Sequence, residues 1–232
     1  MDSLRDTIAV VTGASRGAGR GIAYELGRSG ATVYVTGRST QESSTDGRPE
    51  TIEQTAAGVT ARGGLGIPVR CDHTDPDEIT CLFQQIQDQH GQIDLLVNSV
   101  FGGSEASLPA GQGKRFWERP PEHWDAMMVA GPKAYLLTTR AAVPLLQQSS
   151  AALIINLTSF TPDQAAGNLY YDLAMQASAT MRPKPPLTSD ELSLPSHRIR
   201  IFCNGPGKLC SWRTSRATTA SRTRTERSRR RL

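Results

Sequence analysis

Three glycines near the N-terminus have the spacing of a phosphate-binding loop. Gly13, Gly17 and Gly19 lie in the stretch 12–19, TGASRGAG, between an apolar run and a segment with helical apolar spacing. Glycine permits positive φ and a close approach of backbone N–H groups to a phosphate. The N-terminus of the following helix adds partial positive charge. We therefore predict that this loop, Ser15 included, binds a dinucleotide pyrophosphate; a plain tight turn is the alternative.

Two arginines favour one dinucleotide over the other. Arg38 follows a second apolar run, 31–35, where an acidic residue would accept hydrogen bonds from the ribose of NAD, and no acid lies in reach there. Arg16 lies inside the glycine loop. Two guanidinium groups suit charge-assisted pairing with the 2′-phosphate of NADP, so NADP is the predicted cofactor and NAD is less favoured. Alternatively, both arginines are solvated surface charges.

Alternating strands and helices would position these residues. Continuous β-branched runs, typical of strands buried on both faces, alternate with segments of helical periodicity. Strands are expected at 7–11, 31–35, 66–69, 93–97, 152–156 and 199–202, and helices at 21–26, 49–61, 77–89, 124–146 and from about 171. This succession predicts an α/β fold with a Rossmann-type, doubly wound parallel sheet, in a single domain over residues 1–210.

The net charge of +4 comes from the C-terminal tail. Residues 211–232 hold eight arginines and one acidic residue, so that 18 of the 26 basic and 21 of the 22 acidic residues lie in residues 1–210. A mildly acidic body is not typical of a nucleic-acid-binding domain. The Arg/Ser/Thr-rich tail itself is expected to be disordered, and RNA binding through it is the less favoured interpretation.

Other classes of protein find little support in the composition. The N-terminus lacks the apolar region of a secretory signal, and no stretch approaches the ~18 apolar residues of a membrane span, which predicts a cytoplasmic protein. The four cysteines form no C-x-x-C pair and have no metal-ligand spacing with histidine. We therefore expect reduced thiols and no metal site; a zinc site and a disulfide framework are the less favoured alternatives.

The motifs together resemble the short-chain dehydrogenase/reductase family. The resemblance is carried by the glycine loop at 12–19, by CDHTD at 71–75 and by LLVNSVFGG at 95–103. It extends over about residues 5–175, weakens toward 207 and is not found beyond. It implies an oxidoreductase that uses a nicotinamide cofactor on a small-molecule carbonyl or alcohol, and that commonly forms homo-oligomers.

Two residues acquire cofactor roles from this resemblance. Asp72 would hydrogen-bond the adenine amino group, and Asn98 would stabilise the central strand beside the cofactor. From the residues alone, Asp72 could instead cap a helix and Asn98 could simply end a strand. His73 is expected to be solvated and without a role.

The same resemblance implies the catalytic residues. The family uses a tyrosine, a lysine four residues later, and a serine 12 or 13 residues earlier. Ser159 and Tyr171 match this spacing, with Tyr170 as the rival tyrosine, but Met175 stands at the place of the lysine. A lysine ammonium lowers the pKa of a neighbouring phenol, and methionine cannot. NADP-dependent carbonyl reduction with Tyr171 as proton donor is therefore expected to be impaired, and a nucleotide-binding pseudoenzyme is the alternative.

Further departures lie in the second half of the chain. Gly131-Pro132 replaces the family's helix asparagine and predicts a kink. Pro206 and Gly207 resemble the family's Pro-Gly near the nicotinamide. Beyond them the usual substrate lid and final strand are not recognisable, which suggests a truncated or out-of-frame terminus. The stretch 101–121 either walls an apolar pocket or is a surface loop.

Overall fold

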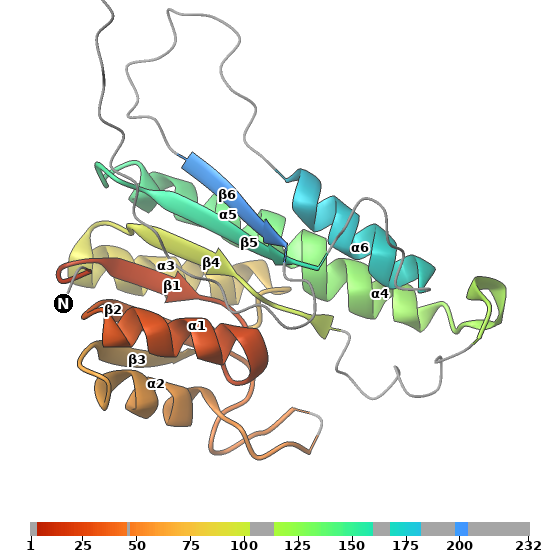
Figure 1. The fold of residues 1–232 in the computed structure, drawn as a ribbon, viewed down its shortest axis with the longest axis horizontal. Coiled ribbons are helices and arrows are strands. Elements are labelled where there is room, and N and C mark those ends of the chain that lie inside the picture. Colours follow the sequence, from red (N-terminus) through yellow and green to blue (C-terminus); the bar gives the residue numbers. More distant parts are fainter. Residues whose placement is uncertain (1–3, 46, 103–113, 160–167, 182–197, 204–232) are drawn as a thin grey trace, which may run out of the picture.

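The computed structural model describes residues 4–45, 47–102, 114–159, 168–181 and 198–203, the last of these by its backbone alone. Its centre is a six-stranded sheet in the order β3-β2-β1-β4-β5-β6, with parallel neighbours throughout (Figure 1). The strands are β1 Ile8–Val11, β2 Thr32–Gly37, β3 Leu65–Arg70, β4 Leu95–Asn98, β5 Leu153–Thr158 and β6 Arg198–Cys203. This strand order is that of a Rossmann sheet, so the predicted fold class is confirmed.

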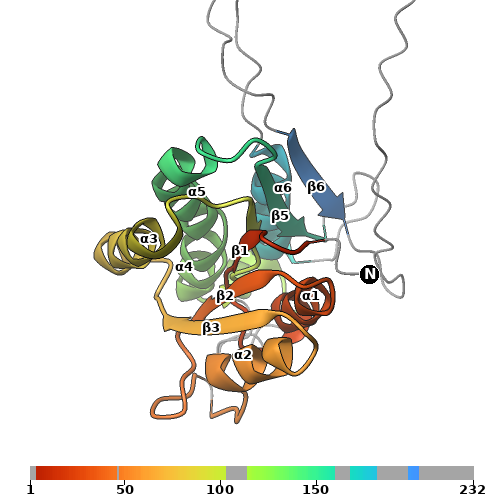
Figure 2. The same ribbon diagram turned by 90° about the vertical axis from the view of Figure 1, so that its left-hand side faces the viewer.

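Helices cover both faces of the sheet. They are α1 Gly17–Arg28, α2 Ile52–Thr60, α3 Pro76–His90, α4 Glu122–Met128, α5 Ala134–Leu146 and α6 Leu169–Thr180, with short turns η3 Phe116–Glu118 and η4 Val129–Lys133. Figure 2 shows α1 and α2 on one side of the sheet and α3 and α5 on the other. The crossover connections place the carboxyl ends of all the strands at one edge of the sheet, where ligands of such folds bind.

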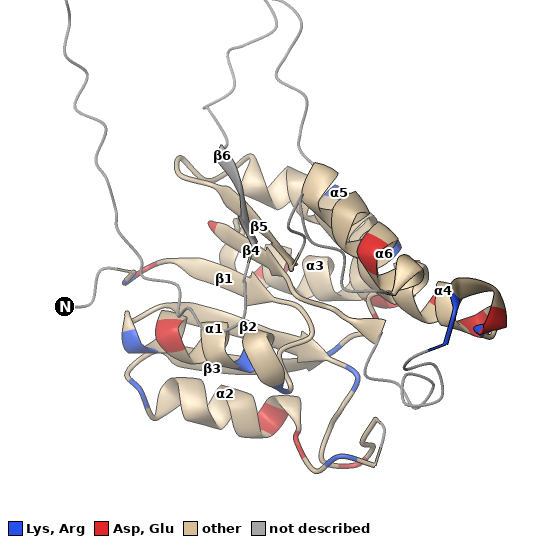
Figure 3. Ribbon diagram, turned by 45° about the vertical axis from the view of Figure 1, so that its right-hand side comes forward, with Lys and Arg blue, Asp and Glu red and all other residues tan. Residues whose placement is uncertain are grey.

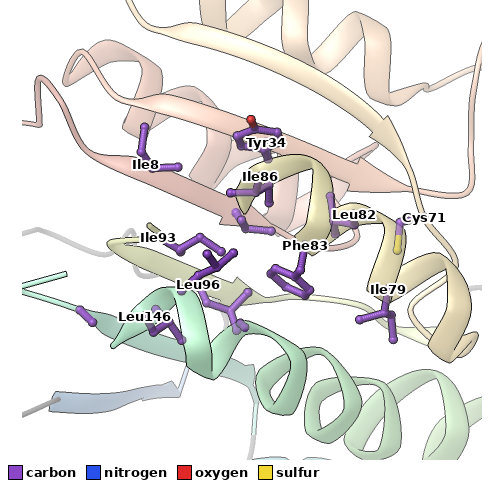
Figure 4. Close-up of a cluster of buried hydrophobic side chains, with 14 residues drawn as sticks. Ile8, Tyr34, Cys71, Ile79, Leu82, Phe83, Ile86, Ile93, Leu96 and Leu146 are labelled. Carbon is purple, nitrogen blue, oxygen red and sulfur yellow. The ribbon is translucent and has the colours of Figure 1, made fainter. Parts of the chain in front are cut away.

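Two apolar clusters hold the layers together. One joins the sheet to α3 and α5, with Tyr34, Ile86 and Leu96 fully buried (Figure 4). The other lies between the sheet and the helices α1 and α2. Every residue of β1 and β4 is buried, which explains their continuous apolar sequence. The edge strand β3 is largely exposed and accommodates Pro68.

The segment 122–146 is bent at its middle. The sequence predicted one helix there with a kink at Gly131-Pro132, and the structure divides it into α4, η4 and α5. Ala130 (φ −86°, ψ 27°) and Gly131 (φ −136°, ψ −107°) leave the helical conformation directly before Pro132. The kink is confirmed, and it has the physical cause expected of an interior proline.

Several expectations concern residues outside the described ranges. Pro206, Gly207, the lid region and the tail 211–232 are among them. Within the described part, basic and acidic residues are interspersed along the ribbon (Figure 3). In those same ranges, every helix is too short or too polar to cross a bilayer.

Candidate active site

A cavity of about 520 Å³ opens at the carboxyl ends of the strands. Segments far apart in the sequence contribute to it: the glycine loop, the end of β2 and the loop after it, the segments that follow β3 and β4, the end of β5, and α6. Its lining includes Gly13, Ser15, Arg16, Gly17, Gly19, Arg38, Ser39, Thr45, Arg48, Glu50, Cys71, Asp72, His73, Thr74, Ser99, Phe101, Tyr135, Ser159, Tyr171 and Met175. The cavity therefore brings most of the predicted site residues together.

Each of the three glycines in the loop occupies its position for a different structural reason. Gly13 has φ +62°, and a Cβ there would lie 2.8 Å from the carbonyl oxygen of Ser99. Gly17 has φ +58° and faces open space, at the first residue of α1. A Cβ at Gly19 would lie 2.7 Å from the carbonyl oxygen of Gly13. The loop thus packs tightly against the chain after β4 and leaves the helix N-terminus accessible, as phosphate binding requires.

Arg16 and Arg38 approach the cavity from two elements. Arg16 Nη2 donates to Ser39 Oγ at 3.3 Å and to Thr45 Oγ1. Arg38 Nη1 lies 3.6 Å from Asp72 Oδ2, in a half-exposed ion pair. From the sequence we predicted that no acidic residue lies within reach of the end of β2. This prediction was wrong, because Asp72 faces Arg38 there. Glu50 also lines the cavity, because the loop after β2 folds back toward it.

The carboxylate of Asp72 is fixed by hydrogen bonds within its own turn. Its Oδ1 accepts hydrogen bonds from the backbone N–H of Thr74 at 2.9 Å and from Thr74 Oγ1 at 2.7 Å. Partial burial acts to raise the pKa of Asp72, but the hydrogen bonds from Thr74 and the charge of Arg38 outweigh it and hold that pKa below its usual value. The alternative that Asp72 caps a helix is wrong, because Asp75 accepts the first N–H groups of α3.

Asn98 lies behind the cavity and does not line it. Its fully buried side chain donates through Nδ2 to Thr139 Oγ1 at 3.0 Å and to Asn156 Oδ1 at 2.9 Å. These bonds tie the end of β4 to α5 and to β5. The contacts are those of a residue that stabilises the central strands next to the cavity.

His73 is buried, contrary to the sequence prediction of a solvated residue. Its Nε2 is hydrogen-bonded to Thr36 Oγ1 at 2.7 Å and its Nδ1 to Thr138 Oγ1 at 2.9 Å. Burial lowers the pKa of His73 to about 4, so the ring is neutral near pH 7. Local sequence carries no signal for this arrangement, because the two threonines lie on β2 and α5.

Ser159 and Tyr171 meet at the opposite end of the cavity. The serine follows β5, the tyrosine lies in the first turn of α6, and their hydroxyl groups are hydrogen-bonded. The ring of Phe101 contacts that of Tyr171 edge-on, with centroids 5.9 Å apart. The rival Tyr170 is partly buried, lies outside the cavity lining and packs on Trp124. Of the two adjacent tyrosines, Tyr171 is therefore the one whose hydroxyl group lies beside Ser159 in the cavity.

Met175 occupies the cavity wall one helical turn from Tyr171. Met175 is buried, with 7% of its surface exposed, and its backbone carbonyl accepts a hydrogen bond from Thr158 Oγ1 at 2.8 Å. Tyr135, which the sequence did not single out, also lines this end and donates to the carbonyl of Leu157 at 3.1 Å. Burial raises the pKa of Tyr135. Among the described residues, no lysine lines the cavity.

A Rossmann sheet with a glycine loop at β1 and a Ser–Tyr pair at β5 and α6 defines a dinucleotide-binding protein of the dehydrogenase type. A family model for short chain dehydrogenases matches residues 7–171. The chain belongs to the short-chain dehydrogenase/reductase family, as its motifs predicted.

Individual relatives agree with this assignment. The chain is 36% identical over 157 residues to dehydrogenase/reductase SDR family member 1 of Mus musculus, covering 67% of this chain and 47% of that protein. Identity to the Homo sapiens protein of that name is 34% over 171 residues, covering 73% and 51%. The chain thus spans about half the length of these relatives. A metagenomic short-chain oxidoreductase solved in complex with NADP has a TM-score of 0.67 and 27% identity, covering 88% of this chain and 84% of that one.

Proposed function

We propose that this protein is an NADP(H)-dependent oxidoreductase that reduces a small-molecule carbonyl to an alcohol, with Tyr171 as the proton donor. The observation that carries the proposal is the hydrogen-bonded Ser159–Tyr171 pair in the same cavity as the glycine loop. A similar short-chain oxidoreductase was solved with NADP, which supports the choice of cofactor.

The residues present fit a dinucleotide. Gly17 opens the N-terminus of α1 toward the cavity, where the pyrophosphate would receive backbone N–H groups. Arg16 and Arg38 would hold the 2′-phosphate by charge-assisted hydrogen bonds. Asp72, ionised and fixed by Thr74, would accept from the adenine amino group. Pro206 and Gly207, outside the described ranges, remain proposed neighbours of the nicotinamide.

When bound, the nicotinamide supplies the hydride that the carbonyl carbon receives. Ser159 and Tyr171 would hold the carbonyl oxygen through their hydroxyl groups and so orient the carbon. As negative charge develops on that oxygen, hydrogen bonds from the two hydroxyl groups stabilise it. The proton of the Tyr171 hydroxyl then moves to the oxygen and completes the alcohol. Phe101 and Met175 would exclude water from this end of the cavity.

The missing lysine shapes the expected activity. Met175 carries no charge that could stabilise a tyrosinate, so Tyr171 serves better as an acid than as a base. We therefore favour reduction over oxidation and expect slow turnover. The neutral thioether is also the observation that favours a second candidate function, a pseudoenzyme that binds the nucleotide without turning over a substrate.

The test first measures cofactor binding and then measures turnover of carbonyl substrates. We expect saturable quenching of protein fluorescence by NADPH at lower concentration than by NADH, followed by carbonyl-dependent oxidation of NADPH across a panel of aldehydes and ketones. Binding without turnover would support the pseudoenzyme. No binding of either cofactor would overturn both candidates.

A further inference from the structure

A turn in the loop between β2 and α2 is anchored to the glycine loop. The backbone N–H of Arg48 donates to the carbonyl of Thr45 at 3.3 Å, and Gly47 between them has φ 63°, a value that favours glycine. Arg16 Nη2 lies 3.5 Å from the same carbonyl and also donates to Thr45 Oγ1. The Arg16 side chain and the Arg48 backbone therefore converge on one residue, which brings the turn to the cavity.

This turn adds a guanidinium that the sequence analysis did not identify. Arg48 is exposed and lines the cavity together with Arg16 and Arg38. Of the residues that the structure describes, the acidic ones in the lining are Glu50 and Asp72, and Asp72 already faces Arg38 at 3.6 Å. Among the described residues that line this end of the cavity, three guanidinium groups and two carboxylates leave a positive excess, which suits a dianionic ligand.

We propose that Arg48 is a specificity-determining residue that binds the 2′-phosphate of NADP(H) together with Arg16 and Arg38. This rests on the proposed function, because it deepens the cofactor choice made there. A phosphate monoester presents three acceptor oxygens, so it can pair with more than two guanidinium donors. Thr45 and Ser39, which hold Arg16 through their hydroxyl groups, keep that donor beside the turn. Arg48 thus distinguishes the phosphorylated from the unphosphorylated adenosine.

Two adenosine fragments test this without any catalytic step. Isothermal titration of the full chain would compare adenosine 2′,5′-bisphosphate with adenosine 5′-monophosphate, which lacks the 2′-phosphate. We expect Arg48→Ala to weaken binding of the bisphosphate about tenfold or more and to leave the monophosphate unchanged, because one charge-assisted hydrogen bond to the phosphate is lost. Arg48→Lys should retain part of the preference. Added salt should reduce the difference between wild type and Arg48→Ala in their affinity for the bisphosphate.

The matched control is Arg28→Ala, which removes a guanidinium from α1 whose side chain is 66% exposed and outside the cavity lining. It should bind both fragments as wild type does. If wild type prefers the bisphosphate and Arg48→Ala keeps that preference, the inference fails and the NADP proposal stands. Equal weakening of both fragments by Arg48→Ala would also overturn it. If wild type itself shows no preference, the NADP proposal fails as well.

Discussion

The hydroxyl of Ser159, directly after β5, is hydrogen-bonded to the hydroxyl of Tyr171 in the first turn of α6. Asn168 accepts the backbone N–H of Tyr171 at 3.4 Å as the N-cap of that helix, so the start of α6 determines where the phenol lies. The pair is thus held by a strand end and a helix start, both of which lie at the cavity.

The first prediction separates the two adjacent tyrosines. Tyr171→Phe should lower carbonyl reduction by about 100-fold or more while NADPH still binds, because the proton donor is removed and the ring is kept. Steady-state NADPH oxidation and fluorescence titration measure the two effects. Tyr170→Phe, at the neighbouring tyrosine outside the cavity lining, is the control and should retain full activity. The reverse pattern would make Tyr170 the acid.

The second prediction concerns a positive charge at position 175, where the family has a lysine. Met175→Lys should raise the rate of carbonyl reduction about tenfold or more, because an ammonium one turn from Tyr171 makes the phenol a stronger acid. The rate constant kcat across a pH series measures it. Leu173→Lys adds the same charge to an exposed position of α6 and should have no effect. A wild type without turnover beside an active variant would favour the pseudoenzyme.

The third prediction concerns His73 and pH. Its pKa is about 4 in the folded protein against the ordinary histidine value of 6.5, so the unfolded chain binds the proton more readily between these pH values. The free energy of unfolding should therefore be unaffected by this group above pH 6.5 and should fall as pH drops from 6.5 to 4, by about 3 kcal/mol in all. Urea unfolding at a series of pH values measures this fall.

A histidine elsewhere provides the comparison for that experiment. His73→Asn should lose this component of the pH dependence, whereas His90→Asn, which removes a ring stacked edge-on against Tyr34 at the end of α3, should keep it. An unchanged pH profile in His73→Asn would contradict a buried neutral imidazole.

The fourth prediction concerns Glu50, the acidic residue of the loop between β2 and α2 that lines the cavity. Glu50→Gln should strengthen binding of NADPH several-fold and change NADH binding less, because a carboxylate near a 2′-phosphate repels it. Competitive titration of the two cofactors measures the ratio. Glu53→Gln, in the first turn of α2 and outside the cavity lining, is the matched control and should leave the ratio unchanged. Weaker NADPH binding in Glu50→Gln would show that the carboxylate orients a donor instead.

Local sequence patterns were sufficient to predict the strands of the sheet, the glycine loop and the helix kink. All six expected strands are present, because a strand buried on both faces needs a continuous apolar run that is visible in one short window. The glycine loop and the kink at Gly131-Pro132 were also predictable, since each depends on a backbone property of the residues themselves.

The tertiary structure alone decided which side chains share the cavity. The spacing of 12 residues from Ser159 favoured Tyr171 over Tyr170, but the start of α6 and its packing bring the Tyr171 hydroxyl group to that serine. Likewise, burial of His73 depends on threonines from β2 and α5. Arg48 and Glu50 reach the cavity because a loop folds back on the glycine loop. Such contacts join residues distant along the chain, and periodicity and spacing, which are local, carry no record of them.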